Sequence, residues 1–119
     1  MKMRYIDILI ERQKVRQRYI GNVKKYLQII KKRAKKILGK DTKVYLFGSF
    51  LKGNFGPNSD IDVLIVSPKV PIEASKKSEI LVYLKRGFSA YNPFEIHLAT
   101  PEIFENWYKK FIKEDIKEV

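Results

Sequence analysis

The chain has 119 residues, a formal net charge of +12 and no cysteine. The length suits one domain with its own hydrophobic core, and we expect residues 1–119 to form a single domain. The lack of cysteine excludes disulfides and thiolate metal sites, and it fits a cytoplasmic protein. No apolar run approaches the roughly 20 residues of a membrane span, so we expect no membrane contact.

The positive charge is concentrated in the first third of the chain. Residues 1–40 contain fourteen Lys or Arg and two acidic residues, whereas residues 41–119 contain eleven of each kind. We therefore separate a basic N-terminal helical element, 1–39, from the remaining core and C-terminal helix, 40–119. Such an element can face solvent, an acidic partner or nucleic acid.

Residues 4–38 have a helical pattern that Gly21 could kink or split. In the second half, one set of apolar residues falls within an arc of about 120° and is expected to face the domain: Val23, Tyr26, Leu27, Ile30, Ala34, Ile37 and Leu38. Lysines occupy the remaining surface. A solvated face is the favoured interpretation, because no aromatic residues alternate with the charges as they do in stacking sites for nucleic acid.

Three short stretches predict strands. Residues 42–47 are β-branched and aromatic, and residues 61–66 form the most hydrophobic run, as expected for a strand buried on both faces. Residues 94–99 predict a third strand. Residues 52–59 are rich in turn-forming residues and predict a loop, which would follow a single helical turn beginning at Ser49.

Two further helices are predicted in the C-terminal half. The first covers about 72–88, and its inward residues are expected to be Ile72, Ile80, Leu81, Leu84 and Phe88. The last covers about 101–113, because the pair Thr100-Pro101 is a favourable helix start. Its aromatic residues have helical spacing and are expected in the core: Phe104, Trp107, Tyr108 and Phe111.

The order of these elements predicts an α+β fold, a mixed sandwich with a small three-stranded sheet and about four helices. The first two strands must be antiparallel if Gly48 and Ser49 are to share a site with Asp60. The second and third strands are joined by a helix and should be parallel. Glu95, at the start of the third strand, then lies at the same end of the sheet as Asp60.

Three carboxylates are therefore expected in one corner. Asp60 and Asp62 share a strand face because strand side chains alternate, and Glu95 joins them from the next strand. Without cysteine or histidine partners at metal-ligand spacing, such a cluster suits Mg²⁺ or Mn²⁺. A bound cation would relieve the repulsion between the carboxylates and could bridge nucleotide phosphates.

Residues near these carboxylates are candidate phosphate contacts. Gly48 lets the backbone approach a phosphate, Ser49 offers a hydroxyl, and Lys52 offers a positive charge. His97 shares a face with Glu95. We favour a structural histidine at the edge of the site over a catalytic base, and both interpretations stay open.

The spacing Gly48-Ser49, ten residues, then Asp60-Ile61-Asp62 resembles the signature of the DNA polymerase beta-like nucleotidyltransferase superfamily. The short chain is most similar to its minimal nucleotidyltransferases, the MNT type, over about residues 40–100. The resemblance implies that Asp60 and Asp62 are paired metal ligands, with Glu95 as the third carboxylate, and that Gly48 and Ser49 contact the nucleotide phosphates.

Two residues depart from the family pattern. Lys52 stands where the small members usually have arginine, which weakens bidentate phosphate recognition. Glu95 stands where many members have aspartate, so the carboxylate is carried on a longer side chain.

The resemblance also implies an activity. It is the metal-dependent transfer of a nucleoside monophosphate, AMP from ATP, to a hydroxyl acceptor. Members of this type often pair with helical HEPN proteins, and some act as antitoxins, which makes a tyrosine of such a partner a candidate acceptor. The alternatives are a non-catalytic nucleotide-binding or antitoxin module that acts by contact, and a nucleic-acid binder that uses the basic N-terminal helix.

Overall fold

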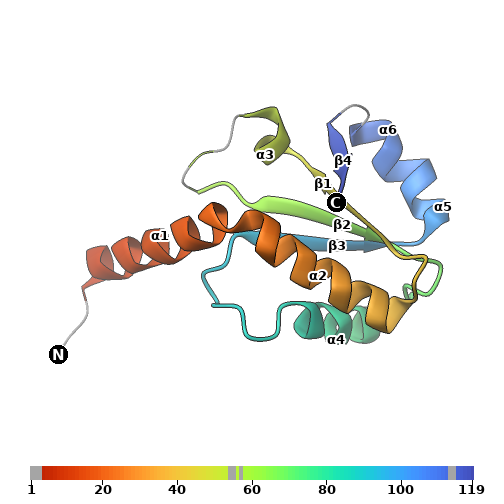
Figure 1. Ribbon diagram of the computed structural model, residues 1–119, viewed down its shortest axis with the longest axis horizontal. Helices are drawn as coiled ribbons and strands as arrows, with labels where there is room; N and C mark the ends of the chain where they lie inside the picture. The colour runs from red at the N-terminus through yellow and green to blue at the C-terminus, as the bar shows by residue number, and fades with distance from the viewer. Residues whose placement is uncertain (1–3, 54–55, 57, 113–114) are drawn as a thin grey trace.

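The computed structural model describes residues 4–53, 56, 58–112 and 115–119. Two consecutive helices begin the described chain, and strands separated by helices follow, as Figure 1 shows. The helices are α1 (Tyr5–Gly21), α2 (Val23–Leu38), α3 (Ser49–Lys52), α4 (Ala74–Leu84), α5 (Pro101–Ile103) and α6 (Lys109–Ile112), with a π-helical turn at Phe104–Tyr108 between the last two. The strands are β1 (Lys43–Phe47), β2 (Ile61–Val66), β3 (Phe94–Ala99) and β4 (Ile116–Glu118).

The strands form one mixed sheet in the order β3-β2-β1-β4. β1 is antiparallel to β2 and β2 is parallel to β3, which confirms both predicted pairings and the α+β class. The sheet has four strands and not three, because β4 pairs with the free edge of β1. β4 has only three residues, Ile-Lys-Glu, and this is too short a segment to show the alternation that identifies a strand.

The predicted N-terminal helix is two helices. α1 ends at Gly21, and Asn22 is the boundary residue of both helices, with φ −122° and ψ 31°. The Asn22 side-chain amide donates to the Arg18 carbonyl at 2.9 Å, which stabilises the break. α1 then projects away from the sheet (Figure 1), and it exposes apolar side chains on its first turns: Tyr5, Ile6, Ile8 and Ile10.

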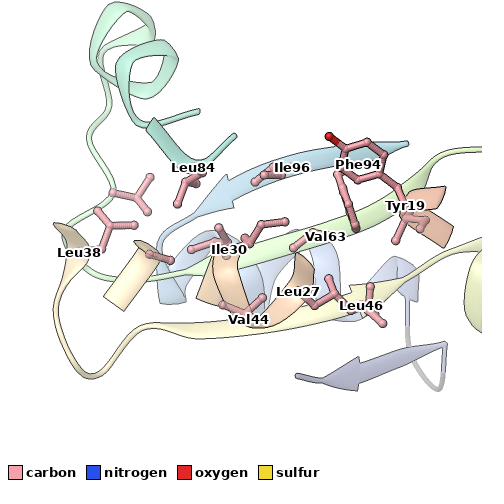
Figure 2. Packing of buried hydrophobic residues seen from close by; sticks show 14 of the residues in the cluster. Tyr19, Leu27, Ile30, Leu38, Val44, Leu46, Val63, Leu84, Phe94 and Ile96 are labelled. Carbon is pink, nitrogen blue, oxygen red and sulfur yellow. The ribbon is translucent and has the colours of Figure 1, made fainter. Parts of the chain in front are cut away.

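One face of the sheet is covered by α2 and α4 and holds the larger hydrophobic core (Figure 2). Ile30 and Ala34 of α2 and Leu84 of α4 are fully buried there against Val63 of β2. The predicted apolar arc of α2 is therefore confirmed at its centre. Ile37, near the end of this helix, is exposed.

The opposite face is covered by the C-terminal helical segment. Leu64 and Ala99 of the sheet are buried beneath Phe104 and Tyr108, and the Phe104 ring stacks on Tyr45 with 5.0 Å between ring centroids. Trp107 is 62% exposed, so the prediction that it belongs to the core is wrong. The π-helical turn Phe104–Tyr108 changes the number of residues per turn, which rotates Trp107 away from the face that Phe104 and Tyr108 share. The side chain of Phe111 lies outside the described residues.

The region between β2 and β3 also departs from expectation. α4 begins at Ala74, so Ile72 precedes the helix in a bend, and its side chain is 91% exposed where an inward position was predicted. Phe88 follows the helix and packs as predicted, with its ring 5.9 Å from that of Phe94. No described helix is both long enough and apolar enough to cross a membrane.

Leu84→Ala should destabilise the fold by about 2–5 kcal/mol, because it opens a cavity where α2, α4 and the sheet meet. Ile72→Ala is the matched control, and its effect should stay within about 0.5 kcal/mol because this side chain lies in solvent. Urea unfolding followed by circular dichroism measures both. Equal losses in the two variants would contradict the packing described here.

Candidate active site

The site lies where β1 ends and where β2 and β3 begin. Asp62 of β2 is in register with Phe47 on one side and with Glu95 of β3 on the other. Residues in register on paired strands point to the same face of the sheet, so the two carboxylates share a face, and His97 shares it two residues further along β3. The predicted meeting of Asp62 and Glu95 is therefore present in the structure.

His97 lies within reach of both carboxylates. Its Nε2 atom is 3.7 Å from Asp62 Oδ1 and 3.7 Å from Glu95 Oε1. The imidazole ring also lies against two aromatic rings, with 5.4 Å between its centroid and that of Phe47 and 6.3 Å to that of Tyr108. One edge of the ring thus faces the carboxylates, and the ring body packs on the smaller core.

This cluster is electrostatically strained. Burial raises the pKa of Asp62, and the negative charge of Glu95 raises it further, while His97 acts in the opposite direction. One potential ligand atom from each of these three residues lies within 4.8 Å of the others. A divalent cation fits this donor set, because it would relieve the repulsion between the carboxylates. Carboxylate oxygens suit Mg²⁺ or Mn²⁺, and the imidazole nitrogen extends the choice to other transition metals.

Asp60 is placed apart from this group. β2 begins at Ile61, so strand alternation does not hold Asp60, and its Oδ1 atom lies 3.6 Å from the guanidinium of Arg16. Its side chain is 50% exposed. Within the described part of the chain, the set of close ligand atoms contains Asp62, Glu95 and His97 but not Asp60. The charge of Asp60 nevertheless contributes, as the weakest cause, to the raised pKa of Asp62.

Gly48 touches the cluster from the end of β1. Its φ is +85°, and a Cβ atom built on it would lie 2.5 Å from Asp62 Oδ2. Sequence reasoning assigned Gly48 to a close approach of phosphate. The structure shows a second requirement, since any side chain at this position would displace the Asp62 carboxylate.

The other predicted phosphate contacts lie on α3. Ser49 is its first residue, directly after Gly48. Lys52 is its last residue, and its Nζ atom is 3.3 Å from Asp115 Oδ2, just before β4. This ion pair joins α3 to the C-terminal segment. Both side chains are about half exposed, so the pair is weak and Lys52 can exchange Asp115 for another anion.

Sequence reasoning missed two basic residues beside the carboxylates. Arg16 is 2% exposed although it belongs to the basic N-terminal element. The one feature of the sequence that could have predicted its burial is its position next to Val15 and three residues before Tyr19, which are the other buried residues of α1. Lys85 follows α4. Burial lowers the pKa of Lys85, whereas the charges of Asp60 and Glu95 raise it. In the sequence, Lys85 forms a Lys-Arg pair directly before Gly87, and this pattern predicts an exposed helix end and not a residue near the carboxylates.

Residues 23–119 match the nucleotidyltransferase domain family. The chain belongs to this family. A solved candidate nucleotidyltransferase is 31% identical, with a TM-score of 0.57, and the match covers 83% of this chain and 98% of the other. A second, from Sulfolobus solfataricus, is 20% identical with a TM-score of 0.53, and the match covers 92% of this chain and 83% of the other. A search of curated proteins finds no match.

The superfamily predicted from the Gly48 and Asp62 motifs is therefore confirmed, and the chain is an enzyme of the nucleotidyltransferase kind. The MNT subtype stays a prediction. The family match begins at residue 23, so α1, Tyr5–Gly21, lies outside it.

Gly48→Ala in this nucleotidyltransferase should weaken Mn²⁺ binding about 10-fold or more, because the added methyl group displaces the Asp62 carboxylate. Gly53→Ala is the matched control. Gly53 also has positive φ, +76°, but a Cβ atom there has no heavy atom within 4 Å. Gly53 is in the left-handed region, with ψ 6°, where alanine should cost about 1–2 kcal/mol of stability. Gly48 has ψ −157°, a region that essentially only glycine adopts, and alanine there should cost about 1–3 kcal/mol. Isothermal titration calorimetry with Mn²⁺ separates them, and equal losses of affinity would contradict the role of the Asp62 contact.

Proposed function

We propose that this nucleotidyltransferase transfers a nucleoside monophosphate, AMP from ATP, to a hydroxyl acceptor with the help of Mg²⁺ or Mn²⁺. The observation that carries the proposal is the register of Asp62 with Glu95 beside Gly48, which gathers two carboxylates at a glycine turn. Membership of the family supports nucleotidyl transfer in general. The nucleotide, the metal and the acceptor are parts of the proposal.

In this proposal Asp62 and Glu95 hold a divalent ion and Asp60 joins them as a further ligand. A bound ion supplies positive charge against the phosphate oxygens of the nucleotide and lowers the pKa of an acceptor hydroxyl. Gly48 and Ser49 bind the phosphates, and Lys52 reaches them after leaving Asp115. These residues place the nucleotide at the carboxylate end of the sheet.

We assign His97 a structural role. Its Nε2 atom faces both Asp62 and Glu95, and its ring packs against the rings of Phe47 and Tyr108. A histidine held in this way orients the carboxylates. To act as a catalytic base, His97 would need its Nε2 atom directed at the acceptor hydroxyl and not at the Asp62 and Glu95 carboxylates.

The proposed acceptor is a hydroxyl group on a protein partner, a helical protein of the HEPN type, for which this chain would act as an antitoxin of the MNT type. The exposed apolar residues of α1 support a protein partner: Tyr5, Ile6, Ile8 and Ile10.

We also propose that 1–119 work as one domain, with the helical element 1–39 packed on the catalytic core 40–119. The inclusion of Val15 and Tyr19 in the larger core supports this.

Transfer of labelled AMP from ATP to candidate partner proteins, in the presence of Mg²⁺, tests the activity. Asp62→Asn and Glu95→Gln should each lower labelling by about 100-fold or more, because loss of a direct ligand should exceed the 10–100-fold cost of losing residues behind the ligands. Glu102→Gln is the control, since this exposed carboxylate lies on α5 outside the cluster. Equal labelling by wild type and Asp62→Asn would refute the site.

A second candidate function is a module that acts on its partner by contact without catalysis. The pairing of Lys52 with Asp115 favours it, because the lysine is then withdrawn from a bound nucleotide. Calorimetry with ATP and Mg²⁺ distinguishes the two. We expect ATP to bind, and we expect Asp115→Asn to increase its affinity by about 2–5-fold, as the release of an exposed ion pair allows. Undetectable binding of ATP would favour the contact module.

A further inference from the structure

Arg16 is the buried charge of the N-terminal helix. Its neighbours on α1, Arg12 and Arg18, are exposed, whereas Arg16 is 2% exposed. A guanidinium group remains protonated in proteins, so burial is tolerated only where polar atoms replace the lost water. The partners of Arg16 therefore indicate what this side chain does.

Two of these partners lie directly before β2. The guanidinium donates a hydrogen bond to the carbonyl oxygen of Ser59, and its Nη1 atom lies 3.6 Å from Asp60 Oδ1. One turn earlier on the same side of α1, the Gln13 amide donates to Asn58 Oδ1 at 3.0 Å. α1 thus holds three consecutive residues, 58–60, that precede the strand carrying Asp62.

α1 is itself fixed to the body of the domain at this point. Val15 and Tyr19 are buried in the larger core, and the Tyr19 hydroxyl accepts a hydrogen bond from the Ser89 amide at 2.7 Å. The Tyr19 ring also meets Phe94, the residue before Glu95, with 6.1 Å between centroids. The Arg16 guanidinium is consequently placed by packing that also supports β3.

We propose that Arg16 is a positioning residue of the metal site, where it holds Ser59 and Asp60 so that the Asp60 carboxylate, which lies outside the Asp62–Glu95–His97 cluster, is kept close enough to act on Asp62 and to join a bound ion. The inference rests on the proposed function, in which Asp60 is a metal ligand. It assigns a part of the site to α1, which lies outside the family match of residues 23–119.

The physical reason is the place of Asp60 in the chain. It follows a turn-rich segment and precedes the first residue of β2, so the ladder of the sheet does not order it. Without Arg16 the backbone at 59–60 would have to be ordered when the metal binds, and this entropy loss would weaken binding. In the folded protein Arg16 already holds this backbone, through its hydrogen bond to the Ser59 carbonyl oxygen. The half-exposed carboxylate still remains accessible to an ion from solvent.

Calorimetric titration of the full chain with Mn²⁺ tests the inference. Arg16→Met removes the guanidinium but keeps a long buried side chain, and it should weaken Mn²⁺ binding about 10-fold or more. Arg12→Met removes an exposed arginine from the same helix and should leave the affinity unchanged. Urea unfolding of each variant confirms that the titrated protein is folded.

A double-mutant cycle separates positioning from a general loss of structure. If Arg16 acts through Asp60, then Arg16→Met should change Mn²⁺ affinity less than about 2-fold in an Asp60→Asn background. An equal loss in both backgrounds would overturn the inference, as would wild-type affinity in Arg16→Met. If Arg16→Met does not fold, Arg16→Lys is used in its place. Lysine keeps the positive charge but lacks the planar guanidinium with its several N–H donors, so this variant must weaken Mn²⁺ binding at least about 3-fold relative to Arg12→Lys.

The same titrations distinguish this inference from the proposed function. If Asp62→Asn abolishes Mn²⁺ binding while Asp60→Asn leaves it intact, Asp60 is not a ligand. The role of Arg16 is then refuted and the Asp62–Glu95 site stands. If neither substitution alters Mn²⁺ binding, the proposed metal site itself is refuted.

Discussion

The register of β2 between β1 and β3 is the constraint on which the site depends. β2 places Asp62 opposite Phe47 and Glu95 at once, and one residue of slip in either pairing would turn a carboxylate to the other face of the sheet. Burial of Ile61, Val63 and Ile65 on the α2–α4 face opposes that slip, because each would have to exchange its place with a side chain of the other face. The core on the α2–α4 face thus maintains the geometry of carboxylates that lie on the opposite face of the sheet.

That geometry is unfavourable by itself. Burial and the neighbouring Glu95 raise the pKa of Asp62. The fold therefore holds the two carboxylates at a distance where they repel each other more than they would if free in water. Gly48 tightens the arrangement further, because its lack of a side chain lets Asp62 Oδ2 come within 2.5 Å of where a Cβ would be. His97 offsets part of the charge. Such a cluster is stable in a folded protein when packing elsewhere supports it, and here both faces of the sheet are packed.

The N-terminal helices have different roles although both are basic. α2 lays its apolar face on the sheet and leaves most of its lysines in water, as its sequence period requires. α1 has no strong apolar face. It projects from the domain and attaches through its last turns, where Val15, Arg16 and Tyr19 are buried. The net charge of this region does not reveal that one of its arginines lies inside the domain, beside an acidic residue of the proposed site.

Local patterns determined much of this protein. The three longer strands and the apolar face of α2 follow from the hydrophobic period of short segments. The parallel pairing of β2 with β3, and with it the meeting of Asp62 and Glu95, follows from the helix that joins these strands. The antiparallel pairing of β1 with β2 followed only from the requirement that Gly48 share a site with the carboxylates. Contacts between distant segments decided the rest. β4 forms because the edge of β1 is available for pairing, and Trp107 is exposed because a π-helical turn rotates it away from the sheet. Asp60 lies beside Arg16 because the end of α1 packs against the segment before β2. A buried arginine and an exposed one look alike in a basic helix, and only packing distinguishes them.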